Sequence, residues 1–417
     1  MDIIEFIYKA AGIAGTVLGL CYLYQVVYMF VPFFLKLKPH KPAVLHTIGV
    51  IIAARNEEQV LPHLLDTIKA QDYPADRIRV YVVADNCTDN TAQAAREKGA
   101  MVFERFNKRQ VGKGYALNYL LGRMDNLGEL DQCDAFLVLD ADNLLTPGYI
   151  TAMNRTFSDG YEICCGYRNS KNFNQNWISS GYGLWYLHDS VHLNLSRMLL
   201  GTSCAVSGTG FMFSRQVYRE MGGWNFFTLT EDIEFNMYSV LHGRKIGYCH
   251  EAMLYDEQPT TFRQSWRQRI RWSQGGYQVS GKYGLRLIAS IFKPGKGRYA
   301  RFEMSTLTMW WCGVSVLLLG TSIVLTPFVH SWGALIPLAV TGILGSYGSF
   351  WLMGTLVTMT EWKKIPGSAR QKLWNTITYP IYMFTWVPIS ACALFSKFEW
   401  KPIEHTVAVS LQDLPNK

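Results

Sequence analysis

Hydrophobic and polar positions divide the chain into two kinds of segment. Three long runs, at residues 10–35, 304–360 and 373–396, contain no charged residue. A spanning helix needs about 20 apolar residues, so the outer runs each predict one helix, and the middle run predicts two, divided near residues 327–337. The first run is too long for a signal peptide and lacks a small-residue cleavage pattern. Residues 37–303 are long enough for a sizeable globular domain.

The charges beside these runs predict how the chain crosses the membrane. Positive residues favour the cytoplasmic side, and the loop at residues 361–372 carries four of them. We therefore expect a multi-pass protein of the plasma membrane whose 37–303 domain is cytoplasmic. Four spans would put both termini outside, which the lysines of the tail do not favour. Pro380 and Pro388 leave open a re-entrant or broken last segment.

Within the globular stretch, short apolar runs alternate with helical patterns. Residues 47–54 form a continuous apolar run of the kind found in buried parallel strands, and a helical pattern follows at residues 58–70. Further strand-like runs lie at residues 78–84, 101–104 and 135–139. This alternation predicts an α/β domain with a mainly parallel sheet, in which ligands bind at the carboxyl ends of the strands.

Polar and acidic residues follow three of these predicted strands. Arg55 and Glu57 follow the first strand, Asp85 the second, and Asp140 and Asp142 the last. Carboxylates two positions apart lie on one face of an extended chain, where they can converge on a divalent cation such as Mg²⁺ or Mn²⁺. An Asp-x-Asp turn also occurs by chance, so this pair alone does not establish a metal site.

Three other features carry groups suited to chemistry. Lys113 lies between two glycines, where it can reach a phosphate, although the spacing is not that of a P-loop. Thr230 is a candidate N-cap, and Glu231 and Asp232 after it could be catalytic or could simply complement the helix dipole. Residues 268–272 offer an amide, a guanidinium and a flat apolar ring.

The composition is that of a folded protein, and its positive charge is concentrated in one segment. The 417 residues are 49% hydrophobic and only 17% charged, which excludes a disordered chain, a coiled coil and a small disulfide scaffold. Forty basic and 32 acidic residues give a net charge of +8, and residues 262–301 hold ten basic residues, no acidic one and several aromatic rings. Nucleic-acid binding is one interpretation. The position just before membrane helices favours an amphipathic segment on anionic lipid, and we expect no nucleic-acid partner.

In this order before C-terminal membrane helices, four motifs resemble the membrane-embedded processive branch of glycosyltransferase family 2: Asp85, the Asp140 and Asp142 pair, residues 230–232 and residues 268–272. That branch includes cellulose, chitin, hyaluronan and poly-N-acetylglucosamine synthases. The resemblance covers about residues 45–400 and implies a GT-A (nucleotide-diphospho-sugar transferase) fold. The parts that it implies are an N-terminal transmembrane helix (1–36), a cytosolic GT-A domain (37–258), basic interface helices (259–303), about three transmembrane helices (304–397) and a tail (398–417).

The resemblance also implies a role for each site residue. Asp232 would be the general base, with Glu231 supporting it, and Asp140 and Asp142 would bind Mg²⁺ or Mn²⁺. The nucleotide-sugar would be held by Arg55, Glu57, Asp85, Lys113, Asp140, Gln268, Arg271 and Trp272. The acceptor site would be formed by Ser207, Gly208, Thr209 and Trp272.

The function implied is a processive, inverting β-glycosyltransferase that polymerises a hexose from a UDP-sugar and extrudes the product. UDP-glucose is slightly favoured. Two alternatives stay open: a poly-N-acetylglucosamine-type synthase using UDP-N-acetylglucosamine, and a non-processive glycolipid glycosyltransferase. Two places depart from the family pattern. Residues 84–87 read Ala-Asp-Asn-Cys where relatives often read Asp-Asp-Gly-Ser, so one acid is missing while the second is kept, and Asn143 stands where some cellulose synthases have histidine. A transporter is disfavoured because His330 is the one ionisable His, Asp, Glu, Lys or Arg in the middle apolar run.

Overall fold

A computed structural model describes residues 3–295, 297–330, 332–396 and 410–411. Its globular part is built on one sheet of eight strands in the order β3-β2-β1-β4-β7-β6-β8-β5. The strands are β1 (Ile48–Ala54), β2 (Ile78–Asp85), β3 (Met101–Arg105), β4 (Ala135–Asp140), β5 (Leu144–Leu145), β6 (Ile163–Ser170), β7 (Phe211–Ser214) and β8 (Ile246–Asp256).

The sheet has two halves of different character. Strands β1 to β4 are parallel neighbours and match the four predicted strands closely, which confirms the α/β fold with a mainly parallel sheet. β7 runs antiparallel to both β4 and β6, β6 runs parallel to β8, and β5 runs antiparallel to β8. Sequence patterns did not identify the strands of this second half, which brings a second set of side chains to the same edge.

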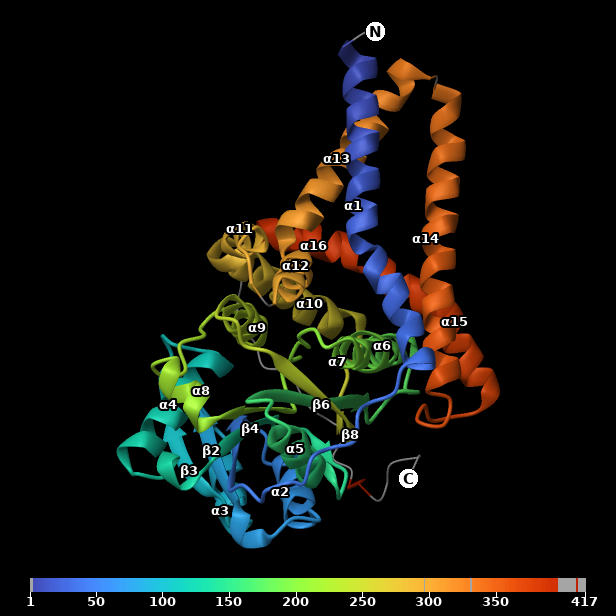
Figure 1. Cartoon of the computed structure of the whole chain (residues 1–417). Coiled ribbons are helices and arrows are strands. Elements are labelled where there is room, and N and C mark those ends of the chain that lie inside the picture. The colour runs from blue at the N-terminus through green and yellow to red at the C-terminus, as the bar shows by residue number, and fades with distance from the viewer. Residues whose placement is uncertain (1–2, 296, 331, 397–409, 412–417) are drawn as a thin grey trace.

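Helices cover both faces of the sheet (Figure 1). Along β1, Val50 and Ile52 face a core shared with α2 and α5, whereas Ile51 faces a core shared with α4, α6 and α9. This alternation follows from the two-residue period of a strand. The helices are α2 (Leu61–Lys69), α3 (Thr91–Glu97), α4 (Lys113–Asn126), α5 (Tyr149–Ser158), α6 (Trp177–His188), α7 (Leu195–Leu200), α8 (Arg215–Glu220) and α9 (Glu231–Leu241).

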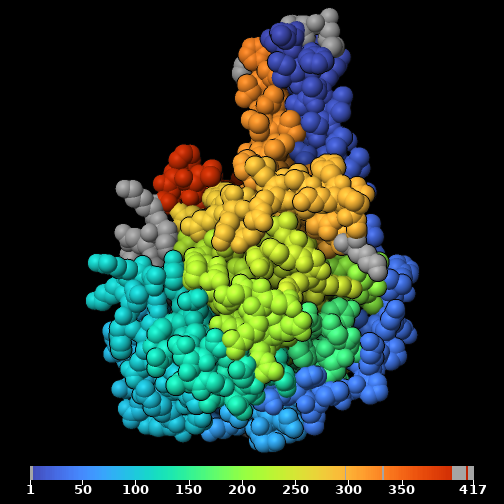
Figure 2. All heavy atoms as spheres, turned by 60° about the vertical axis from the view of Figure 1, so that its left-hand side comes forward, coloured from blue at the N-terminus to red at the C-terminus, as the bar shows by residue number. Residues whose placement is uncertain are grey.

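A layer of helices lies between part of the sheet domain and the long apolar helices. It consists of α10 (Phe262–Val279), α11 (Leu285–Ile291) and α12 (Arg298–Thr306), which lie across the foot of the narrow upper part of the molecule (Figures 1 and 2). Most of the basic residues between positions 262 and 301 belong to this layer. The layer therefore connects the sheet domain to the long apolar helices.

Four helical stretches are long and apolar enough to cross a membrane, the number expected from the sequence. Three of them, α1 (Ile3–Phe34), α13 (Met309–Val329) and α14 (Trp332–Thr360), rise away from the globular part (Figure 1). The fourth is broken at Thr385 into α15 (Ala369–Phe384) and α16 (Trp386–Phe395). α16 lies across the base of the other three and packs on α10 (Figure 1). The structure thus shows the broken last segment that the prolines left open.

Candidate active site

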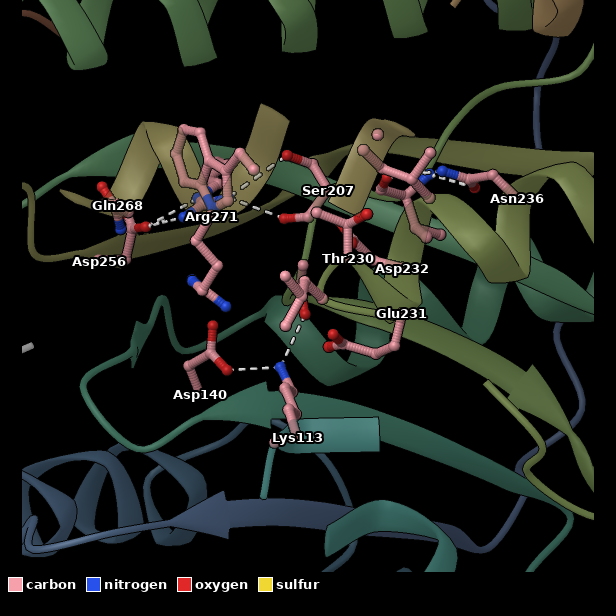
Figure 3. Close-up of a pocket in the computed structure, with 18 of the residues that line it drawn as sticks. Lys113, Asp140, Ser207, Thr230, Glu231, Asp232, Asn236, Asp256, Gln268 and Arg271 are labelled. Atoms are coloured by element: carbon pink, nitrogen blue, oxygen red, sulfur yellow. Dashed lines mark hydrogen bonds and ion pairs between the residues drawn. The ribbon is translucent and has the colours of Figure 1, made fainter. Parts of the chain in front are cut away.

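The candidate site is a cavity of about 520 Å³ between the carboxyl ends of β1, β2 and β4 and the helices α9 and α10. This volume is in the range of a small-molecule site. All the predicted site residues except Thr209 line it, from the strand-end acids to Trp272. Figure 3 shows Asp140 and Lys113 on one wall, facing Arg271 and the pair Glu231 and Asp232.

Two asparagines shape the strand ends that carry the donor-side residues. Asn56 and Asn86, which follow β1 and β2, have φ values of 56° and 55°, a left-handed conformation that asparagine tolerates better than most residues. Asn56 Oδ1 accepts a hydrogen bond from Thr88 N (2.8 Å), and Asn86 Oδ1 accepts one from Asn107 N (2.8 Å). Position 86 therefore holds a loop together, which gives a structural reason for its departure from the family pattern.

Asp85 is held by a cation that sequence reasoning missed. Arg105 Nη1 lies 2.5 Å from Asp85 Oδ1, and both side chains are buried. Arg105 Nη2 also donates to the carbonyl of Gln110 (2.8 Å), so this pair fixes the loop that leads to Lys113. The signal available in the sequence was only a basic residue directly after the predicted strand at residues 101–104.

Asp140 and Asp142 form the candidate metal site. Asp142 Oδ2 accepts a hydrogen bond from Glu257 N (2.9 Å), and Asp140 is partly exposed to the cavity. Among the described residues no group of three or more His, Cys, Asp or Glu side chains could hold a metal alone. Two carboxylates beside a cavity fit a hard cation that takes its other ligands from phosphate and water. Asn143 Oδ1 instead accepts from the backbone N–H of Asp140 (3.1 Å), so it supports the turn.

Lys113 connects the metal-site residue to the predicted acceptor turn. Its ammonium donates to Asp140 Oδ1 and to the carbonyl of Gly208, the latter at 2.7 Å. Although burial opposes the charge, the carboxylates of Asp140 and Glu231 raise the pKa of Lys113, which stays cationic. Lys113 is the first residue of α4, where Gly114 permits close packing, because a Cβ there would lie 2.0 Å from the carbonyl oxygen of Phe226.

Glu231 and Asp232 are the first residues of α9 and share the cavity wall. Burial and the neighbouring charge of Asp232 raise the pKa of Glu231 to about 7. Burial raises the pKa of Asp232 as well, although the N–H of Ile233 and the charge of Lys113 oppose this. Two adjacent carboxyls with raised pKa values in a cavity are suited to moving a proton near neutral pH.

Thr230 does not cap α9 in the predicted way. It occupies the N-cap position, but its hydroxyl makes no capping hydrogen bond. The side chain packs against α10 at Gly275, where a Cβ would lie 2.5 Å from Thr230 Oγ1. The turn before α9 is held by Glu234, whose Oε2 accepts from Phe227 N and Thr228 N, each at 3.0 Å.

The turn at residues 207–209 meets Asp232, the predicted base, and Asp140, a predicted metal ligand. Gly208 has φ +77°, and a Cβ on it would lie 3.8 Å from Asp232 Oδ2. Thr209 lies behind the cavity wall, where its hydroxyl accepts from Asp140 N (2.9 Å), so its position supports the metal site and does not line the predicted acceptor site. Ser207 lines the cavity, as predicted for an acceptor-site residue.

A buried ion pair beneath this turn was not identified from the sequence. Arg168 on β6 donates through Nε to Asp256 Oδ2 on β8 (2.7 Å) and through Nη1 to the carbonyl of Ser207 (2.7 Å). Its guanidinium carbon lies 3.7 Å from the centre of the Tyr186 ring. Burial raises the pKa of Asp256 to about 6, and Arg168 opposes the shift. The available signal was Asp256 itself, an acid that ends a strand-like run as Asp85 and Asp140 do.

The residues of the 268–272 motif face in different directions from α10. Arg271 extends into the cavity toward Asp140 (Figure 3). The carbonyl oxygen of the Gln268 side chain is buried and has no hydrogen-bond partner within the described residues, so it can accept from a ligand. Trp272 lies 5.9 Å from Trp185 and 6.2 Å from Trp386, measured between ring centroids. These two partner rings come from α6 and α16 and were not predicted.

A mainly parallel sheet with acids at its strand ends, facing an acidic helix start across one cavity, is the arrangement of a GT-A transferase. The family model described as "Glycosyltransferase like family 2" matches residues 46–275, more than half of the chain, and the chain belongs to this family. This confirms the family resemblance read from the motifs.

The chain is similar to curated proteins of different kinds. The chain is 29% identical to a β-monoglucosyldiacylglycerol synthase of Synechocystis sp. over 237 residues, covering 55% of this chain and 48% of that protein. It is 24% identical to a poly-β-1,6-N-acetyl-D-glucosamine synthase of Staphylococcus epidermidis over 269 residues, covering 62% and 63%. The chain thus spans about half the length of the first of these relatives.

One solved structure resembles nearly the whole chain. The mannosyltransferase PcManGT from Pyrobaculum calidifontis, in complex with GDP-Man and Mn²⁺, superposes with a TM-score of 0.57 at 16% identity. The match covers 94% of this chain and 98% of that one. The two proteins therefore share a fold that includes the helices outside the sheet domain.

Proposed function

We propose that the protein transfers a hexose from a UDP-sugar, with inversion, to an acceptor hydroxyl at the cytoplasmic face of the plasma membrane. One observation carries this proposal: Asp232 and Glu231 share a single cavity with Asp140, Lys113 and Arg271. The first two supply a base, and the others supply metal ligands and positive charge for a diphosphate. UDP-glucose is the slightly favoured donor.

The donor side would stabilise the departing diphosphate. Asp140 and Asp142 would hold Mg²⁺ or Mn²⁺, which supplies Lewis-acid stabilisation of the leaving UDP when bound. Arg271 would contribute a fixed cationic fork and Lys113 a point charge. Support for a nucleotide-sugar and a divalent metal also comes from PcManGT, whose structure contains GDP-Man and Mn²⁺.

On the acceptor side, Asp232 would remove the proton of the attacking hydroxyl. The electron pair left on the oxygen forms the new bond to the anomeric carbon from the face opposite the diphosphate. The bond between that carbon and the phosphate oxygen breaks, and UDP leaves with its electrons. Glu231, with a pKa near 7, would carry a proton beside the base and limit repulsion between the two carboxyls.

Processive synthesis of a β-glycan is the second candidate, and a specific observation favours it. Trp185, Trp272 and Trp386 all line the same cavity, and flat rings of this kind can stack on sugar rings. The poly-β-1,6-N-acetyl-D-glucosamine synthases among the relatives support this candidate and also the alternative donor UDP-N-acetylglucosamine. Radiolabelled UDP-glucose, UDP-N-acetylglucosamine and UDP-glucuronate, offered in turn to the purified protein, identify the donor.

Asp232→Asn tests the base assignment. Since the amide cannot accept the proton, we expect transfer to fall by about 10²–10⁴-fold while UDP binding stays unchanged. Turnover with the donor found in the screen and calorimetric titration with UDP measure the two effects. Asp76→Asn, an exposed position far from the cavity, is the control. Retention of wild-type turnover by Asp232→Asn would refute the assignment.

A further inference from the structure

The cavity has a second, apolar end that a nucleotide-sugar does not need. Beyond Asp232 its wall is made of Ile233 and Met237 from α9, Met304 from α12, and Leu307 and Met309 at the start of α13. A UDP-sugar carries no hydrocarbon chain, and its charged and hydroxyl groups match the polar end. Unbranched methionine side chains adapt to flexible apolar ligands.

This apolar end lies where the chain enters the membrane. Met309 begins the candidate span Met309–Val329, and Leu307 and Trp310 beside it are 40% and 44% exposed. The adjoining layer presents further exposed apolar side chains, Leu285 and Phe292, between its basic residues, as an interfacial amphipathic segment does. A hydrocarbon chain could thus pass from the bilayer to the cavity over apolar surface.

Gly276 of α10 leaves room for a passage between the apolar end of the cavity and the start of α13. Gly276 lines the same wall, and a Cβ on it would lie 3.1 Å from Met309 Cε. That separation is closer than ordinary van der Waals contact, so a larger side chain at position 276 would press directly on the methionine.

We propose that the acceptor is a membrane lipid whose uncharged headgroup presents a hydroxyl to Asp232 while its hydrocarbon lies along Met237, Met304 and Met309. The inference rests on the proposed function and names its acceptor class. An uncharged headgroup suits a position beside Asp232, whose ionised carboxylate would repel a phosphate, whereas Lys113 and Arg271 serve the diphosphate of the donor. The hydroxyl proton passes to Asp232, the oxygen bonds to the anomeric carbon, and UDP departs.

The test uses the full chain in phosphatidylcholine nanodiscs with dioleoylglycerol, Mg²⁺ and radiolabelled UDP-glucose. Label is counted separately in the organic phase, in precipitated glycan and as free sugar, because free sugar reports donor cleavage by water. The variants are Gly276→Leu and Met309→Glu, which narrow or charge the passage. Gly281→Leu is the matched control, since this glycine is exposed on the next helical turn and a Cβ added to it would meet nothing within 4 Å.

We expect label in the organic phase for the wild type and the control. Both passage variants should form at least about tenfold less of that product, while release of free sugar, which reports cleavage of the donor by water, stays within about twofold of the wild type. The inference would be overturned if glycan formed without the lipid, or if both passage variants transferred label to the lipid as well as the wild type does. UDP-sugar cleavage would remain intact in either case. Absence of UDP release by every protein would instead contradict the proposed function itself, and the acceptor inference with it.

Discussion

At the residue scale, the site depends on side chains that position other side chains. Lys113 bridges Asp140 and the Gly208 carbonyl, and Arg168 bridges Asp256 and the Ser207 carbonyl. The turn at residues 207–209, the proposed acceptor turn, is therefore fixed from both sides by buried, charge-assisted hydrogen bonds, which are stronger than neutral ones. Displacement of this turn would move the surface beside Asp232 without touching the donor.

Arg168→Lys tests this positioning role. A lysine has one nitrogen in place of the planar guanidinium fork whose separate nitrogens reach Asp256 and the Ser207 carbonyl, so we expect the Ser207 turn to loosen. The KM for the acceptor should rise about tenfold, with a smaller change in kcat and none in the affinity for UDP. Steady-state kinetics and UDP titration measure these quantities. Arg155→Lys, in an exposed pair with Glu251, is the control. Equal losses in donor and acceptor binding would indicate a general structural role.

At the element scale, the break between α15 and α16 brings Trp386 to the cavity. Arg269 is fully buried in α10 and donates to Thr385 Oγ1 (2.7 Å) and to the carbonyl of Tyr382 (3.4 Å) at the end of α15. A cation at a helix C-terminus is favourable, and the guanidinium also lies 5.3 Å from the Trp386 ring. α10 thus holds α16 across the base of the three long apolar helices.

Arg269→Met should weaken the contact between α10 and the junction of α15 and α16. Loss of the hydrogen bonds and of the ring contacts is expected to lower stability by about 1–3 kcal/mol. Thermal unfolding in detergent measures the effect, and transfer should fall because Trp386 no longer has a fixed place. Arg267→Met, exposed on the same helix, should leave both unchanged. A variant as stable and active as wild type would show that α16 does not need the buried cation.

At the scale of the whole molecule, three candidate spans and a bent fourth segment favour a sheet domain and a residue 411 that lie on the same side of the membrane. The start of α1 and the end of α13 lie together, with the Tyr8 and His330 rings 5.4 Å apart. Leu411 packs against Leu144 and Tyr255 of the sheet domain. This arrangement places residues 410–411 on the same side as the sheet domain.

Cysteine labelling in intact cells tests this topology. In a variant without native cysteines, His330→Cys should react with a membrane-impermeant maleimide added outside, because the ring is exposed at the far end of α13. Ser410→Cys should react only after permeabilisation. Labelling of position 410 in intact cells would show that the fourth apolar segment crosses the membrane.

The sequence by itself determined the features that depend on neighbouring residues. Apolar runs of strand or span length identified β1 to β4 and the long helices, and the acids after those strands marked one edge of the sheet. The ordered motifs indicated the family because they keep their types and order along the chain. These signals are local, so a period or a spacing is enough to read them.

Only the tertiary structure decided which distant residues meet. Arg168 reaches Asp256 because β6 and β8 pair in parallel, and Trp185, Trp272 and Trp386 meet because α6, α10 and α16 converge. The apolar end of the cavity likewise needs α9, α12 and α13 together. No sequence period specifies such contacts, since they depend on strand order and helix packing, and these contacts form the proposed acceptor side of the site.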